Sequence, residues 1–231
     1  MTNRTNKTSL RAAALIAGFA IFTSAMAAPF AELYVYPKLV VPYNGAETAK
    51  NIMANKTLFV AGMFAYLITF MCDVVIAWWL YVLLKPVNEN LSLLAAWFRL
   101  VYSVLALVAL NNLVTAFRLL TTPDYLTIFE PARLYAQAMV SLRAFRNHWY
   151  FGIIFFAIHL EILGYLITRS NYIPKILGVL LIITGLGYLL TTVRPYLFPD
   201  INVDFAMYTF YGELIFMLWL LIKGPGIKES N

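Results

Sequence analysis

The sequence has few of the residues on which metal centres, disulfides and common catalytic sites depend. Its 231 residues include one cysteine, two histidines and 12% charged side chains. The single cysteine, Cys72, cannot build a disulfide framework or a cysteine-based metal site. The two histidines, His148 and His159, are too few for a haem held between facing helices or for a typical catalytic zinc centre. We therefore expect neither a metal nor another cofactor.

The chain also lacks a run or stripe of basic residues, although its formal net charge is +6. Lysine and arginine stand at the ends of apolar runs, which is typical of membrane topology and not of nucleic-acid binding. No Gly-x-Ser-x-Gly stretch presents a serine nucleophile, which argues against an intramembrane serine protease. We expect no nucleic-acid partner, and we assign no catalytic residue.

Apolar residues, in contrast, are abundant and fall in long runs. Hydrophobic residues make up 62% of the chain, and the mean hydropathy is +0.76. Because each helical crossing needs about 20 mostly apolar residues, we predict an all-α, polytopic membrane helical bundle of about six transmembrane helices. It would form one transmembrane domain over residues 1–231. The predicted spans are residues 11–36, 57–84, 91–117, 149–168, 176–193 and 205–222.

The first span has an alternative interpretation. Arg4, Lys7 and Arg11 precede a short alanine-rich core, as in a cleavable signal peptide. The apolar run continues to Tyr36, which is long enough to cross a bilayer, so we expect a retained helix and keep cleavage as the alternative. Among the short loops, those on the same side of the membrane as the N-terminus carry more lysine and arginine. This distribution predicts that both termini are cytoplasmic and that Glu32 lies toward the outside.

The third loop is long enough to hold a helix of its own, at residues 130–147. Apolar residues recur there every three or four positions, at Leu134, Ala138, Leu142 and Phe145. Arginines occupy other positions of the segment, at Arg133, Arg143 and Arg146. We predict a short interfacial helix whose arginines meet anionic lipid headgroups, with an ordinary solvated connector helix as the alternative. The lipid bilayer is the expected partner, and the sequence leaves a homo-oligomer open.

Five ionisable residues fall inside the predicted spans and are the candidate functional residues. They are Asp73, Arg99, His159, Glu161 and Glu213. Counted from the predicted cytoplasmic ends, they fall in one slab, roughly 14 to 18 Å deep for Asp73 and Arg99. That pair stands on a tight hairpin and is predicted to form a structural ion pair. His159 and Glu161 are about 200° apart around one helix, so only one of them can be central.

This polar layer has two main interpretations. It lines a hydrated site where His159, Glu213 and Glu161 bind or relay a proton or a polar ligand, as in a small transporter or sensor. Alternatively, the polar groups hold helices together in a non-transporting structural or accessory protein. An intramembrane lipid-modifying enzyme, with Glu213 or His159 as the general base, is a third interpretation. The sequence names no ligand.

Several short segments between about Ala13 and Gly224 resemble one known family. They are residues 72–73 (CD), 80–87 (LYVLLKPV), 98–100 (FRL), 159 (H), 164–166 (GYL), 169–170 (RS), 172–180 (YIPKILGVL), 185–188 (GLGY), 212–214 (GEL) and 219–220 (WL). The family they resemble is the bacterial integral membrane family known as domain of unknown function 4386 (DUF4386).

The resemblance implies an α-helical protein of the bacterial cytoplasmic (inner) membrane, and it implies no activity. The family pattern includes Asp73, Arg99, His159 and Glu213. It does not include Glu161, because that position is usually apolar in the family. The resemblance therefore shifts the functional hypothesis from Glu161 toward His159 and Glu213.

Overall fold

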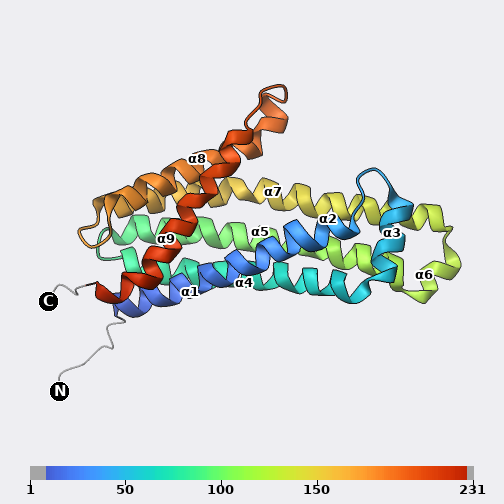
Figure 1. Ribbon diagram of the computed structural model, residues 1–231, viewed down its shortest axis with the longest axis horizontal. Helices are drawn as coiled ribbons and strands as arrows, with labels where there is room; N and C mark the ends of the chain where they lie inside the picture. Colours follow the sequence, from blue (N-terminus) through green and yellow to red (C-terminus); the bar gives the residue numbers. More distant parts are fainter. Residues whose placement is uncertain (1–8, 228–231) are drawn as a thin grey trace, which may run out of the picture. The chain divides into compact units, whose positions relative to one another are not determined.

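The computed structural model describes residues 9–227, apart from the side chains of Leu126 and Met207. Across that range the backbone forms helices and connecting turns without any strand (Figure 1). Six helical stretches in this range are long and apolar enough to cross a membrane. The prediction of an all-α protein with six spanning helices is therefore confirmed. Arg4 and Lys7, on which the signal-peptide alternative rests, lie outside the described residues.

Each candidate span contains one predicted span, but the fourth begins at Pro131, before the predicted start at Trp149. The first, Leu10–Leu39, consists of α1 (Leu10–Pro29), a π-helical turn η1 (Phe30–Val35) and α2 (Tyr36–Leu39). The next four are α4 (Lys56–Leu84), α5 (Glu89–Thr121), α7 (Pro131–Arg169) and α8 (Lys175–Leu197). The last joins a 3-10 turn η2 (Asp204–Phe210) to α9 (Tyr211–Ile222). Shorter helices are α3 (Gly45–Ala54), α6 (Pro123–Ile128) and η3 (Gly224–Gly226).

The structure differs from prediction in the third loop. Of the segment 130–147, expected as a separate interfacial helix, residues 131–147 are the N-terminal part of α7, which continues without a break to Arg169. No proline or glycine stands between Ala132 and Phe151 to interrupt it. At 1.5 Å per residue, a helix of 39 residues is roughly 58 Å long, about twice the hydrocarbon thickness. The short separate helix in this connection is α6.

The chain divides into two compact units. Unit 1 comprises Met1–Phe22, Cys72–Tyr102 and Ile153–Asn231, and unit 2 comprises Thr23–Met71 and Ser103–Gly152. The helices α1, α4, α5 and α7 contribute residues to both. The prediction of one transmembrane domain stays a prediction.

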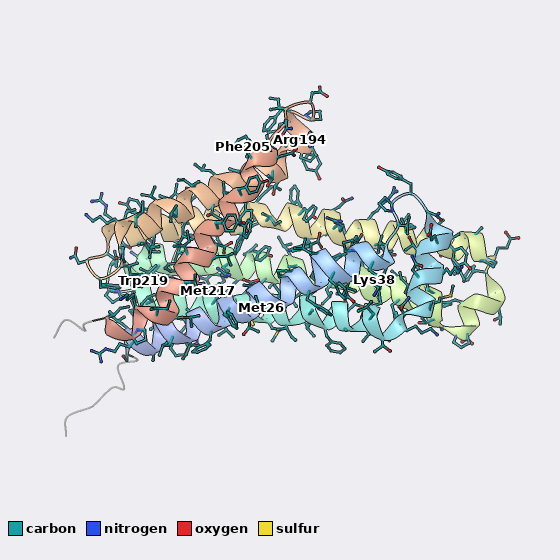
Figure 2. The ribbon with its side chains drawn as sticks, viewed as in Figure 1. Met26, Lys38, Arg194, Phe205, Met217 and Trp219 are labelled. Carbon is teal, nitrogen blue, oxygen red and sulfur yellow. The ribbon has the colours of Figure 1, made fainter. Side chains whose placement is uncertain are left out.

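Unit 1 is packed through glycines that let helices approach closely. Gly164 of α7 faces Gly178 of α8, and a Cβ atom on Gly164 would stand 2.6 Å from the Gly178 carbonyl oxygen. Helix α8 also packs against α9 (orange and red in Figure 1). The connection between them is tied by Arg194, whose Nε donates to the Ile201 carbonyl at 2.8 Å. Figure 2 labels Arg194 near the end of α8 and Phe205 in η2, on either side of this connection.

Unit 2 has an aromatic core. Tyr66 and Phe70 of α4 are 2% and 0% exposed, and Phe145 of α7 is 0% exposed. The Tyr66 ring lies 4.9 Å from the Phe145 ring and 5.5 Å from the Trp149 ring, both edge-on. Edge-to-face pairs of this kind add to the free energy gained by burial. This core fixes the position of the Tyr66 hydroxyl, which belongs to a polar cluster of the same unit.

Candidate functional site

Three of the five candidate residues come together in unit 1. Asp73 of α4, Arg99 of α5 and His159 of α7 are 4%, 4% and 1% exposed. Nε and Nη2 of Arg99 both donate to Oδ1 of Asp73, at 3.0 and 2.5 Å. Nη1 of Arg99 lies 3.1 Å from Nε2 of His159. We call Asp73, Arg99 and His159 the buried triad.

The hydrogen bonds of His159 determine which ring nitrogen carries its proton. A guanidinium group can only donate, so Nε2 of His159 must accept from Arg99. Nδ1 lies 2.8 Å from the carbonyl oxygen of Ala95, which can only accept. The contacts therefore fit a neutral imidazole with its proton on Nδ1. A second proton, on Nε2, would point directly at a cation.

Phe156 connects the triad to the fourth candidate residue. Its ring lies 4.9 Å from the Arg99 guanidinium carbon and 6.0 Å from the His159 ring. The ring of Tyr188, from α8, lies 5.8 Å from Phe156 on the same unit. The Tyr188 hydroxyl donates to Oε2 of Glu213, from α9, at 3.0 Å. Glu213 is partly buried, and among the described residues no ion pair is formed by its carboxyl.

Glu161 lies apart from the triad. Its Oε1 is buried and has no hydrogen-bond partner among the described residues. That oxygen stands beside Gly185 of α8, where an added Cβ would be 2.6 Å away. The angular separation of His159 and Glu161 around α7 explains why only His159 reaches Arg99. The structure brings together Asp73, Arg99 and His159, sets Glu213 next to them through Tyr188, and directs Glu161 elsewhere.

A second polar cluster, in unit 2, is absent from the sequence-based prediction. Glu32 of η1 accepts from the Tyr66 hydroxyl at 2.5 Å and from the Tyr150 hydroxyl at 3.2 Å. Nη2 of Arg146 pairs with Oε1 of Glu32 at 2.8 Å and also bonds Tyr150. We call Glu32, Tyr66, Arg146 and Tyr150 the Glu32 cluster. Its sequence signal is a carboxylate inside a long apolar run, near the end of the first predicted span.

Neither cluster is built as a metal centre. The described residues contain no group of three or more histidine, cysteine, aspartate or glutamate side chains that could hold a metal ion. In the triad, the one carboxylate is occupied by a guanidinium and the imidazole nitrogens are both engaged. The chemistry that these side chains offer is hydrogen bonding.

The comparisons with known proteins identify the family but not an activity. The family described as a domain of unknown function (DUF4386) matches residues 16–224. The chain is also similar to an uncharacterized protein of Archaeoglobus fulgidus, with 36% identity over 170 residues, or 74% of this chain and 86% of the relative. No solved structure matches it. Because the family match covers nearly the whole chain, the protein belongs to the DUF4386 family.

Proposed function

We propose that the protein is a small membrane transporter or sensor for a polar or protonatable ligand, with Glu213 as its proton-exchanging group. The Asp73–Arg99–His159 triad is the fixed scaffold of the site. Tyr188 holds the Glu213 carboxyl at the edge of that scaffold. A carboxyl and a phenol can each donate and accept hydrogen bonds, which is the chemistry that recognises a polar ligand.

One observation supports this proposal above the others. The hydrogen-bond partner of Glu213 is the neutral hydroxyl of Tyr188 and not a cation. The charge of Arg99 is already balanced by Asp73 through two hydrogen bonds, and His159 is neutral in this arrangement. An ionised Glu213 would thus be an additional charge within a membrane-spanning helix, which favours a functional role. The same contacts favour a scaffold role for His159, which the sequence-based hypothesis treats as a partner in titration.

Infrared difference spectroscopy of the protein in lipid nanodiscs tests whether Glu213 exchanges protons. Protonated and ionised carboxyl groups absorb at different frequencies, so a titrating Glu213 gives a pH-dependent band that Glu213→Gln removes. Glu161→Gln is the matched control, because it makes the same chemical change at a neighbouring glutamate of unit 1. A spectrum in which Glu213→Gln leaves every pH-dependent carboxyl band unchanged contradicts the proposal.

A thermal-shift screen then tests for the ligand. A compound that binds the folded protein raises its unfolding temperature to an extent set by its affinity and concentration. We expect polar or protonatable compounds to stabilise the wild-type protein in a pH-dependent manner. Glu213→Gln is expected to lose that pH dependence, whereas Glu161→Gln keeps it.

A packing role is the second candidate function, and the hydrogen bonds within the triad favour it. Every polar atom of the His159 ring has a partner, and both donors of Arg99 that face Asp73 are used. Holding α4, α5 and α7 together is a sufficient role for such a network, and it requires no ligand. In that case Glu213→Gln would unfold at the wild-type temperature at every pH, and no compound would discriminate between the two proteins.

We also propose that both termini face the cytoplasm, in the cytoplasmic membrane. An even number of spans supports termini on one side. So does the contact between the two ends of unit 1, where Nε of Arg11 donates to the Ile227 carbonyl at 2.9 Å. Reporter fusions test the side: a fluorescent protein that folds only in the cytoplasm should be active at either terminus. An active alkaline phosphatase at either terminus contradicts this orientation.

A further inference from the structure

Two neighbouring pockets open on unit 2, where the turn between α2 and α3 meets the N-terminal part of α7. Their volumes are about 450 and 350 Å³, within the range of small-molecule sites. Both pockets are lined by Tyr43, Met139 and Arg143. The shared lining makes them two parts of one hollow, which we call the Arg143 pocket.

The charge of this pocket is positive. Arg146 lines one part of it but is already paired with Glu32 at 2.8 Å. The Arg143 guanidinium lies over the Tyr43 ring, 5.0 Å from its centroid, and forms no ion pair among the described residues. No carboxylate of the described residues lines either part. The pocket therefore offers one uncompensated guanidinium to an anion.

The turn that carries Tyr43 is held in place. Thr48 accepts from the Val41 amide at 3.0 Å and donates to the Val41 carbonyl at 3.2 Å. Tyr43 itself has a φ of 61°, a left-handed conformation that is unfavourable for a bulky side chain. Strained residues of this kind are concentrated at binding sites. Here the strain directs an aromatic ring that is 90% exposed against Arg143.

The remaining walls and the position along α7 indicate which anion fits. Val140, in the wall, is 68% exposed, and Met139 adds a further apolar surface. Arg143 precedes the predicted fourth span, at Trp149, by six residues, or about 9 Å, which is the level expected for lipid headgroups. A guanidinium beside apolar walls at that level suits a phosphate attached to acyl chains better than a freely soluble phosphate.

We propose that the Arg143 pocket binds the headgroup of an anionic phospholipid, with the phosphate on Arg143 and the apolar part of the lipid along Val140 and Met139. The proposal is independent of the function proposed for Glu213, because the two sites share no residue. The three arginines predicted to meet headgroups thereby have different roles. Arg143 binds the lipid, Arg146 is engaged by Glu32, and Arg133 stacks on Phe129, 5.6 Å from its ring centroid.

Native mass spectrometry of the purified full-length protein with phosphatidylglycerol or phosphatidylcholine tests the proposal. We expect the wild-type protein to retain phosphatidylglycerol in preference to phosphatidylcholine. Arg143→Gln should weaken phosphatidylglycerol binding about fivefold, the effect of one basic side chain near an anionic surface. Arg133→Gln removes the same charge from the same helix outside the pocket, and should bind like the wild type. Equal retention of the two lipids, or equal loss in both variants, overturns the proposal.

Two further measurements separate a lipid site from a misfolded variant and from a site for free anions. Val140→Glu places a carboxylate in the exposed wall while Arg143 stays, so it should also lose phosphatidylglycerol; unchanged binding overturns the proposal even if Arg143→Gln fails to fold. Inorganic phosphate serves as the soluble probe. If it displaces phosphatidylglycerol and stabilises the wild-type protein equally well, the pocket is a site for free anions and the lipid proposal is wrong.

Discussion

Arg99 is the residue on which the buried triad depends. It forms two hydrogen bonds with Asp73 and one with His159. Its guanidinium also covers the face of Phe156, so the cation is in contact with an aromatic ring as well as a carboxylate. Because a buried charge is tolerated only when it is paired, the two members of the ion pair should have strongly coupled effects on stability.

Removing one partner of this pair is the first test at the residue scale. Asp73→Asn or Arg99→Gln leaves the other charge buried, which is expected to lower the free energy of unfolding by about 3–5 kcal/mol. Folded yield and thermal unfolding in detergent measure the loss. The exchanged double variant, Asp73→Arg with Arg99→Asp, restores an ion pair and should recover part of it. Recovery is incomplete because Nε2 of His159 would then face a carboxylate. A double variant no more stable than either single one contradicts a direct pair.

The same residues show what sequence alone can and cannot locate. A depth count along the hairpin of α4 and α5 is sufficient to bring Asp73 and Arg99 to one level. It cannot place Glu32, because the partners of that carboxylate, Tyr66 and Tyr150, are 34 and 118 residues away. The orientation of His159 is also beyond the sequence, since it depends on the Ala95 carbonyl, 64 residues away. The sequence predicts how deep a residue lies in the membrane and which face of its helix it occupies. Contacts between helices that are distant in the sequence can be identified only from the three-dimensional packing.

At the scale of elements, the existence of a helix is easier to predict than its ends. Apolar length determines the six spans, because a bilayer requires about 20 apolar residues for each. Polarity, in contrast, does not end a helix. The segment before Trp149 turns polar, which predicts a break there, but α7 continues because no proline or glycine stands between Ala132 and Phe151. A change from apolar to polar residues along the sequence is therefore a poor predictor of where a helix ends.

The crossing of α7 and α8 is expected to be sensitive to added volume. A Cβ on Gly164 would stand 2.6 Å from the Gly178 carbonyl oxygen and 2.7 Å from Cγ1 of Ile182. Gly164→Ala should thus lower the free energy of unfolding by about 1–3 kcal/mol, as overpacking does, although alanine favours helix formation. Thermal unfolding measures it. Gly226→Ala is the control, because no atom lies within 4 Å of its added Cβ. Equal stability of both variants contradicts the close crossing.

At the scale of the whole molecule, each compact unit has its own polar cluster. Unit 1 contains the buried triad with Glu213, and unit 2 contains the Glu32 cluster beside the Arg143 pocket. In both units an arginine is paired with a carboxylate, and in both a tyrosine hydroxyl donates to a glutamate. The apolar composition that predicts a membrane protein thus says little about these clusters, which use few residues from several helices each.

The pH dependence of unfolding provides the test at this scale. Tyr172, in the connection between α7 and α8, donates its hydroxyl to the Leu83 carbonyl at 2.6 Å and so ties that connection to the end of α4. Burial raises the pKa of Tyr172 from 10.0 to about 12. The folded protein therefore keeps this proton at pH values where the unfolded chain has lost it. The stabilisation is complete below pH 10 and declines as the pH rises from about 10 to about 12.

Tyr172→Phe removes both the hydrogen bond and its titration. At pH 8 we expect this variant to be less stable than the wild type by about 1 kcal/mol, the usual value of one hydrogen bond. The difference should shrink as the pH approaches 12, because the wild-type protein loses its advantage there. Tyr165→Phe, at a tyrosine that is 44% exposed, is the control and should follow the wild-type curve. Chemical unfolding in detergent at a series of pH values measures all three proteins. If the difference between Tyr172→Phe and the wild type stays constant up to pH 12, the Tyr172 hydroxyl is not buried in the folded protein as described.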